Sequence, residues 1–455
     1  MRLFSSACSI VLLCFLRLSV TAQETWSLER CLLYAKEHNI QLKQSMLNQQ
    51  SAEQGKKQAL ALMFPDLNAN VGYNSNFGRS IDPGTNSFVN QTVNSNNFWL
   101  GTGVTLFNGF GLLNSFRQSQ LDVLAATYDV QGLSNDISMN IASAFMQIMF
   151  NEELLNVTRE RLTSTKVQLE RTAKLVEAGS LPLGNLMDVE SQFATNELQV
   201  VNAENAVQTS IVALKQLLNL QTSEPFAIER PAVDLPVVDI SSTTVTTIYE
   251  KAMENWPQIK ARESRVNSAK RAEWIAFASY TPTLRASASV STLYSSSYKD
   301  YNLETFEATD IAYGDQLDRN LSQSIGLSLS IPVFNGLQSR TANNRSRLNR
   351  INTELQLQDT KNQLYSSVQQ AYNDASAANR QYEASIKSVA AAERAFSYAE
   401  QRQAVGSMND VDFNISRNNL AIAKSEQLRA KYDYMFRTKI LDFYQGKPLS
   451  FSSNP

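Results

Sequence analysis

The sequence repeats one arrangement of short motifs, and this duplication constrains its fold more than any other feature. Phe107-Asn108-Gly109 closes an alternating stretch and precedes a long helical run, and Phe334-Asn335-Gly336 does the same 227 positions later. Gly179-Ser180 interrupts the first helical run, and Gly406-Ser407 interrupts the second at the same offset of 227. Self-similarity of this kind predicts two tandem structural repeats in one chain.

Upstream of these motifs the two halves keep the same order but differ in length. Phe64-Pro65-Asp66-Leu67 corresponds to Tyr280-Thr281-Pro282-Thr283-Leu284 with an offset of 217 between the prolines, so ten residues differ in a polar loop. Between the halves, a stretch with three prolines breaks the helical period and indicates a connector. We therefore expect a first repeat at 24–220, a connector at 221–247, a second repeat at 248–443 and a tail at 444–455.

The first residues have the composition of an export signal. Arg2 gives a positive start, residues 10–16 are apolar, and Thr21-Ala22-Gln23 resembles a cleavage region. We therefore expect residues 1–23 to be removed as a signal peptide. Cys14 follows Leu13 where a lipoprotein needs a small residue, so we do not expect lipidation.

Composition argues against an enzyme and against nucleic acid as a partner. The formal net charge is −2 and basic clusters are absent from the sequence. His38 is the only histidine, which removes Ser-His and Cys-His nucleophile systems and any multi-histidine metal site. Cys31 is the only cysteine beyond the signal, so we expect no disulfide, no bound metal and no cofactor.

Four segments alternate apolar residues with small polar residues, a period of two that is typical of strands with unlike faces. In the first segment Leu67, Ala69 and Val71 alternate with asparagine and glycine. In the last, Ile325 and Leu327 alternate with serine and glycine. The expected strands span residues 66–75, 96–108, 283–294 and 321–334.

The polar faces of these strands suit a water-filled lumen, because they carry Ser, Asn and Gly in place of Lys and Glu. Each segment also has about the 9–11 residues that a tilted membrane strand needs. Phe98, Trp99, Tyr73 and Tyr294 lie near the expected strand ends, where an aromatic girdle would be. A half-buried sheet in a soluble sandwich is the alternative interpretation.

Membrane insertion would require more than one copy of the chain. Beyond the signal, no run reaches the roughly 18 apolar residues of a membrane-spanning helix. An exported chain of this kind spans a membrane only as a closed barrel, because lipid leaves unpaired backbone groups unsatisfied. The smallest membrane barrels have about eight strands, so four strands per chain imply oligomerisation, and three copies would give about twelve.

Two runs, 112–178 and 337–405, contain no proline and are far longer than ordinary globular helices. At 1.5 Å per residue each run extends about 100 Å. In the second run residues step by four and three without a break, which predicts a coiled-coil seam. The seam residues are Leu364, Val368, Ala371, Ala375, Ala378, Tyr382, Ser385, Val389, Ala392, Phe396 and Ala399. A similar stripe in the first run comprises Ile137, Ile141, Phe145 and Ile148.

Each long run ends at a glycine, and a second helix returns over 185–220 or 410–443, which predicts two helical hairpins. Acidic residues follow both turns and are the best functional candidates. Asp410 and Asp412 follow Gly406, and Asp188 follows Gly179. Two interpretations stay open: the carboxylates cap the returning helices, or they form a cation-attracting ring when several chains assemble.

The order and spacing of these motifs resemble those of the TolC-like outer-membrane efflux proteins over nearly the whole mature chain. The resemblance rests on the doubled organisation, on the two Phe-Asn-Gly motifs, and on the turns Val176-Glu177-Ala178-Gly179-Ser180 and Ala404-Val405-Gly406-Ser407. It implies an α+β membrane protein: a trimeric, 12-stranded β-barrel with four strands per chain, continued by a long α-helical coiled-coil barrel. It further implies a Gram-negative outer membrane and its lipid as the surroundings.

The resemblance also implies partners and site residues. A periplasmic adaptor and an inner-membrane pump would dock on the helical tips, through Gly179, Ser180, Leu181, Gly406, Ser407 and Met408. The family's gate carboxylate corresponds to Asp412, with Asp410 and Asp188 as further gate candidates. The family's second acid, one turn later, is replaced here by Ile415, and Asn185 occupies the matching position of the first half.

These observations favour a passive, gated export duct that belongs to a tripartite efflux or type I secretion system. Its transport energy would come from the partner pump, and the chain itself would not be an enzyme. The alternative is a periplasmic coiled-coil scaffold without a pore, in which the strands form a soluble sheet.

Overall fold

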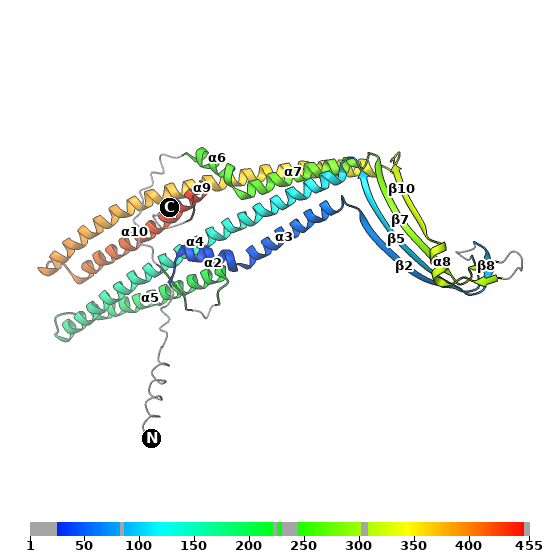
Figure 1. Cartoon of the computed structure of the whole chain (residues 1–455). Coiled ribbons are helices and arrows are strands. Elements are labelled where there is room, and N and C mark those ends of the chain that lie inside the picture. The colour runs from blue at the N-terminus through cyan, green and yellow to red at the C-terminus, as the bar shows by residue number, and fades with distance from the viewer. Residues whose placement is uncertain (1–24, 82–85, 222–224, 230–243, 302–307, 450–455) are drawn as a thin grey trace, which may run out of the picture. The chain divides into compact units, whose positions relative to one another are not determined.

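The computed structural model describes residues 25–81, 86–221, 225–229, 244–301 and 308–449 (Figure 1). The expected signal peptide at 1–23 lies outside these residues, as do parts of the expected connector and tail. The chain divides into two compact units. The first comprises residues 1–46, 130–257 and 361–455, and the second comprises 47–129 and 258–360.

A four-stranded antiparallel sheet dominates the second unit. Its strands are β2 (Asp66–Asn76), β5 (Val93–Phe107), β7 (Thr283–Ser295) and β10 (Ser322–Ser330), in the spatial order β10-β7-β5-β2. Within the described residues β2 and β10 each pair on one side only, so the sheet has two open edges. The register places Leu67 opposite Thr102 and Leu327 opposite Ala286. The residues that form the apolar set of one strand therefore share a face with the apolar set of its neighbour.

Two strand bounds differ from the expectation by more than one residue. The strand β5 begins at Val93 and not at 96, because its first residues still pair with the end of β2, up to Asn76. The strand β10 ends at Ser330 and not at 334, because Pro332 has no N–H to donate to the ladder. The segments expected as polar loops contain short elements: β3 (Arg79–Ile81), β4 (Phe88–Asn90), β8 (Lys299–Tyr301), β9 (Ala308–Asp310) and α8 (Tyr313–Arg319).

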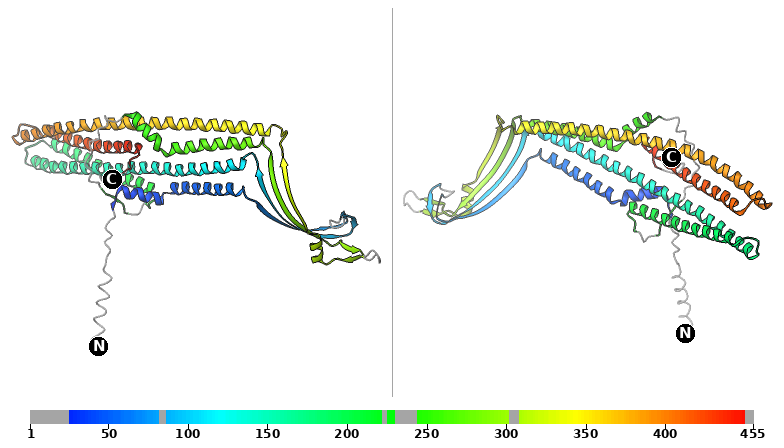
Figure 2. Two further views of the ribbon diagram at one scale, coloured as in Figure 1. Left: turned by 45° about the horizontal axis from the view of Figure 1, so that its top comes forward. Right: turned by 180° about the vertical axis from the view of Figure 1, so that it is seen from behind.

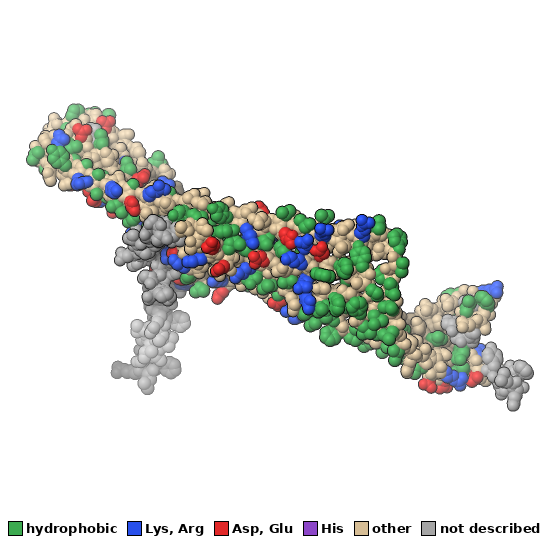
Figure 3. Space-filling model, turned by 90° about the horizontal axis from the view of Figure 1, so that it is seen from above, with side chains coloured by type: hydrophobic (Ala, Val, Ile, Leu, Met, Phe, Trp, Pro, Cys, Tyr) green, Lys and Arg blue, Asp and Glu red, His purple; other side chains and the backbone are tan. Residues whose placement is uncertain are grey.

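One face of the sheet is apolar and uncovered within this chain. Val71 is 72% exposed and Leu327 is 71% exposed, although both are large and apolar. Figure 3 shows a surface on which hydrophobic side chains gather around the sheet. A contiguous apolar surface of this kind marks contact with lipid or with another protein.

The expectation of an aromatic girdle is wrong for Trp99. Trp99 lies in the middle of β5, opposite Asn70 of β2 and Ser291 of β7. It therefore belongs to the polar face, whereas its neighbour Phe98 belongs to the apolar face. The sequence of β5 already indicates this face, because Trp99 and Gly101 are two residues apart and so point to the same side of the sheet.

Each Phe-Asn-Gly motif turns the chain from a strand region into a long helix. Gly109 and Phe110 have φ angles of 64° and 62°, and the amide of Leu112 donates to Asn108 Oδ1 at 3.2 Å. A Cβ on Gly109 would lie 1.9 Å from Thr281 Oγ1, so no other residue fits there. The second motif repeats this geometry, since Gly336 and Leu337 have φ angles of 60° and 68°.

The helices that follow are α4 (Gly111–Glu177) and α9 (Gln338–Ala404), each 67 residues long. In the second unit their first turns pack with parts of α3 (Ile40–Ala61) and α7 (Pro257–Ala278) through polar contacts. Ser268 Oγ donates to Asp122 Oδ1 at 2.6 Å, and Arg350 Nε lies 2.7 Å from Glu273 Oε2. In the described part of the chain, no helix combines the length and the hydropathy needed to cross a membrane.

In the first unit the helices α4 and α9 each run antiparallel to a returning helix, α5 (Leu183–Leu218) or α10 (Asp410–Tyr444) (Figure 2). All eleven residues of the expected seam in α9 are buried or half-buried. The rings of Tyr382 in α9 and Tyr434 in α10 stack with centroids 5.9 Å apart. The seam therefore packs within its own hairpin.

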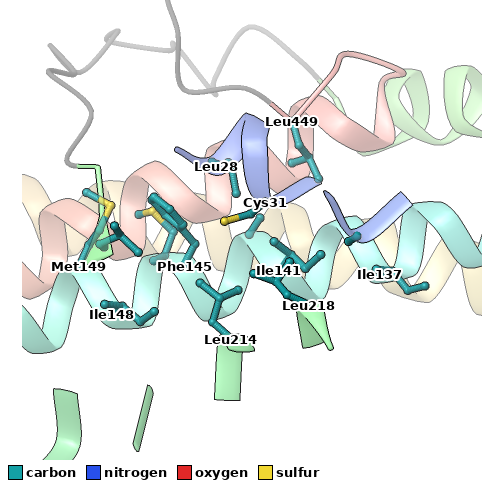
Figure 4. Packing of buried hydrophobic residues seen from close by; sticks show 14 of the residues in the cluster. Leu28, Cys31, Ile137, Ile141, Phe145, Ile148, Met149, Leu214, Leu218 and Leu449 are labelled. Carbon is teal, nitrogen blue, oxygen red and sulfur yellow. The ribbon is translucent and has the colours of Figure 1, made fainter. Parts of the chain in front are cut away.

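The hydrophobic core of the first unit joins α4 and α5 to α2 (Leu28–His38) (Figure 4). Phe145, Ile141 and Ile148 of the expected stripe are fully buried there. Beside this core β1 (Thr25–Trp26) pairs in parallel with β6 (Ala227–Ile228), and α6 (Val245–Asn255) contacts α10. The expected connector therefore contributes packed elements as well as a link.

Cys31 should not react as a thiol in the folded protein. Its side chain is inaccessible to solvent, and burial raises its pKa to about 12, so at pH 8 it is a protonated thiol. We expect the chain without residues 1–23 to release no thionitrobenzoate from Ellman's reagent at pH 8 until denaturant is added. Stoichiometric release from the native protein would contradict the packing of α2.

Candidate functional site at the helical tips

Both hairpin turns have the same backbone geometry. Gly179 and Gly406 each have a φ of 72°. The amide of Ser180 donates to the carbonyl of Leu175 at 2.8 Å, and the amide of Ser407 donates to that of Arg402 at 2.9 Å. Each glycine amide also donates to the carbonyl three residues earlier. This is the Schellman motif, which ends a helix at a glycine in the left-handed conformation.

The second returning helix begins with an asparagine cap. The amide of Asp412 donates to Asn409 Oδ1 at 2.8 Å, and Asn409 Nδ2 donates to Asp412 Oδ2 at 3.0 Å. Asp412 is exposed, and it lies in the first helical turn, where its negative charge is favourable. Asp410 begins α10, but its side chain lies outside the described residues. In the single chain the Asp412 carboxylate thus holds the capping side chain of Asn409, and its charge stays accessible.

Asp188 lies apart from these residues, in a cavity of about 280 Å³ between α4, α5 and α10. Asn185 and Ile415, which stand at the positions of a second acidic ring, line the same cavity. The other lining residues are Val189 and the polar residues Thr165, Gln168, Thr172, Gln192, Asn414, Arg417 and Asn418. The structure therefore brings Asp188 close to residues of the second hairpin, among them Arg417.

Arg417 links the two hairpins and was not among the residues expected from the sequence. Its Nη1 donates to Ser164 Oγ of α4 at 2.7 Å, and its Nη2 donates to Gln168 Oε1 at 3.0 Å. Burial, and then the nearby cation Arg161, lower the pKa of the Arg417 guanidinium from its usual value. A signal was present, because the apolar residues Phe413 and Leu420, four before and three after, place position 417 on the packed side of α10.

The polar groups around Arg417 are incompletely bonded. Among the described residues, Asn414 Oδ1 and Arg161 Nε are buried without a hydrogen-bond partner. A buried polar atom without a partner costs about 1–3 kcal/mol relative to a hydrated one. The contact between the hairpins is therefore weaker than an apolar interface of the same size, and separation of the hairpins would hydrate these groups.

The six residues expected to contact an adaptor all lie at the two turns. Gly179, Ser180, Gly406 and Ser407 are exposed, and Leu181 and Met408 are half-buried. Val405, beside the second turn, is 78% exposed although it is apolar. Within the described residues no cluster of His, Cys, Asp or Glu could hold a metal ion.

The chain belongs to the family described as "Outer membrane efflux protein", whose pattern matches residues 33–220 and 248–442. It is 22% identical over 401 residues to Outer membrane protein TolC of Escherichia coli, covering 87% of this chain and 77% of TolC. It is 20% identical over 335 residues to Alkaline protease secretion protein AprF of Pseudomonas aeruginosa, covering 73% and 66% of the two chains. The resemblance to TolC-like proteins is thereby confirmed, and the chain is an outer-membrane protein of a Gram-negative cell.

The fold agrees with that of solved outer-membrane channels. The Campylobacter jejuni CmeC outer membrane channel aligns with a TM-score of 0.77, at 17% identity, over 92% of this chain and 84% of CmeC. The family consists of channel proteins and not of enzymes.

Replacing Gly406 should destabilise its turn. An alanine at a φ of 72° costs roughly 1–2 kcal/mol, although a Cβ meets nothing within 4 Å there. We expect Gly406→Ala to speed hydrogen exchange of the turn amides by about 5–30-fold. Gly184→Ala is the matched control, because Gly184 lies in the first turn of α5 with equally open space and has no positive φ. Equal exchange in the two variants would contradict a strained turn.

Proposed function

We propose that three copies of this chain form a passive export duct through the outer membrane. The observation that carries the proposal is the two-faced sheet, which has an apolar exposed face, a polar face and two open edges, β2 and β10. Four strands are too few to close a membrane barrel, whereas twelve strands from three chains close one. The apolar face would then contact lipid, and the polar face would line a water-filled passage.

The helical hairpins would form the second part of the duct, in the periplasm. Residues 24–220 and 248–443 would act as two tandem repeats that each contribute one strand pair and one hairpin. An adaptor protein would bind the turns through Gly179, Ser180, Leu181, Gly406, Ser407 and Met408, and an inner-membrane pump would supply the energy. The exposure of the four polar turn residues and of Val405 supports this role.

The same tips would hold the gate. In a trimer, Asp412 and Asp410 of each copy would form an acidic ring at the end of the duct, and like charges held close together attract cations. Asp188 would contribute from the first hairpin. Opening would move α10 away from α4, which requires loss of the bonds from Arg417 to Ser164 and Gln168. Since neighbouring polar groups are unsatisfied in the packed state, hydration would offset part of that loss.

The outward face of the sheet can be tested with adjacent residues of β10. Leu327→Asp would bring a charge into lipid and should abolish the membrane-inserted trimer, measured by fractionation and by mass in detergent. Ser328→Asp would point into water and should assemble normally. Equal tolerance of both substitutions would contradict the barrel and favour the coiled-coil scaffold.

The gate charge can be separated from helix capping at Asp412. Asp412→Asn keeps an oxygen that accepts from Asn409 Nδ2 but removes the negative charge. We expect a lower cation preference, read from the reversal potential of the channel in a planar bilayer under a salt gradient. Glu426→Gln, which changes an exposed acid further along α10, is the control. An unchanged reversal potential in Asp412→Asn would leave capping as the role of this residue.

A further inference from the structure

The polar face of the sheet carries one large aromatic side chain, and its position is unusual. Trp99 lies in mid-strand, directly opposite Asn70 and Ser291, and the next residues of this face along the two neighbouring strands are Asn68, Ser289 and Leu293. These neighbours leave more than a third of the Trp99 side chain open to solvent. Trp99 is 39% exposed. An exposed aromatic ring therefore interrupts a face of small polar groups.

Glycine makes room for the ring to lie flat on the sheet. A Cβ added to Gly101 would lie 2.1 Å from Trp99 Cζ2, so the six-membered ring of the indole covers this residue. Two other glycines of the polar face differ, because the nearest atoms to an added Cβ are 4.0 Å away at Gly72 and 3.6 Å away at Gly326. A ring that lies along the sheet presents its opposite π-face away from the backbone.

A compensated ion pair lies beside the ring. A Cβ on Gly103 would lie 2.7 Å from Arg285 Nη2, so the guanidinium covers Gly103 as the indole covers Gly101. Residues two apart on a strand are about 7 Å apart, so the two side chains are neighbours. Asp66 Oδ2 lies 3.8 Å from Arg285 Nη2, and Asp66 Oδ1 accepts from the Gly103 amide at 2.7 Å. Because Asp66 offsets the charge of Arg285, the ring is the dominant recognition element.

We propose that the Trp99 indole, lying over Gly101, is a stacking site for planar aromatic molecules inside the duct. The site rests on the proposed trimeric barrel, in which this polar face lines the lumen. Each trimer then carries three such rings at one level. A π-face binds flat aromatic groups by stacking and tolerates a positive charge on them. Planar aromatic cargo is retarded at this level, whereas cargo without a flat ring passes without contact.

The test measures equilibrium binding of proflavine, a planar aromatic cation, to the purified detergent-solubilised protein by fluorescence titration. Trp99→Ala should weaken binding about tenfold, as loss of one stacking contact does. Trp99→Phe should retain most of the affinity. Gly101→Ala should also weaken binding, because the new Cβ displaces the ring, while Gly326→Ala on the same face should bind like the natural protein.

The oligomer mass of each preparation, measured by light scattering, separates the two proposals. A monomeric natural protein would overturn the trimeric duct and the site with it. A trimer that binds proflavine equally well with and without Trp99, or that does not bind it, would overturn the stacking site alone. A double variant that carries Gly101→Ala and Trp99→Ala should bind proflavine as weakly as Trp99→Ala alone, because the glycine acts through the ring. If the two losses of affinity were additive, Gly101 would act independently of Trp99, contrary to the proposal.

Discussion

The pairing of backbone groups along the two edges of the sheet is the constraint on which the rest of the molecule depends. The strands β2 and β10 satisfy one side each within the described chain, and the face between them is apolar. In lipid, an unpaired N–H or C=O costs several kcal/mol, so an apolar sheet is stable there only when its edges are closed. Closure by other copies of the chain would pair the backbone groups of both edges and would leave the apolar face in contact with lipid. The duplicated sequence supplies the means, because each half provides two adjacent antiparallel strands and a long helix.

At the other end of the long helices, local backbone chemistry sets the structure. The glycine turns end α4 and α9 identically, but the returning helices start differently: Asn409 caps α10, whereas Pro182 precedes α5 without a side-chain cap. The two hairpins are then linked by a partly buried cation, Arg417, through neutral oxygens of α4. Hydrogen bonds to neutral oxygens fix the orientation of the Arg417 guanidinium, but they bind it less strongly than a buried carboxylate would.

The sequence predicted the strands and the long helices, because the period of two along the strands and the steps of four and three along the helices are unbroken. The seam of α9 shows this well, since every residue on it is at least half-buried. The short elements β3, β4, β8, β9 and α8 could not be predicted, because strands of three residues show no period. At the site, the turn glycines follow from sequence through their backbone requirement. For Arg417 the sequence indicates only the packed side of α10, because its partners Ser164 and Gln168 lie about 250 residues away in the chain. Trp99 lies in mid-strand, away from any girdle, because β5 begins at Val93, three residues before the start that the alternation predicts.

The uncovered face of the sheet also bears on how the protein is made. Before assembly each chain presents Val71, Leu327 and their neighbours to water, beside two strands with free hydrogen-bonding edges. Such a surface invites pairing with any other extended chain, and it does so for as long as the chain crosses the aqueous space before the membrane. Covering the apolar face or pairing the two edges would each reduce the tendency of the chain to aggregate before insertion.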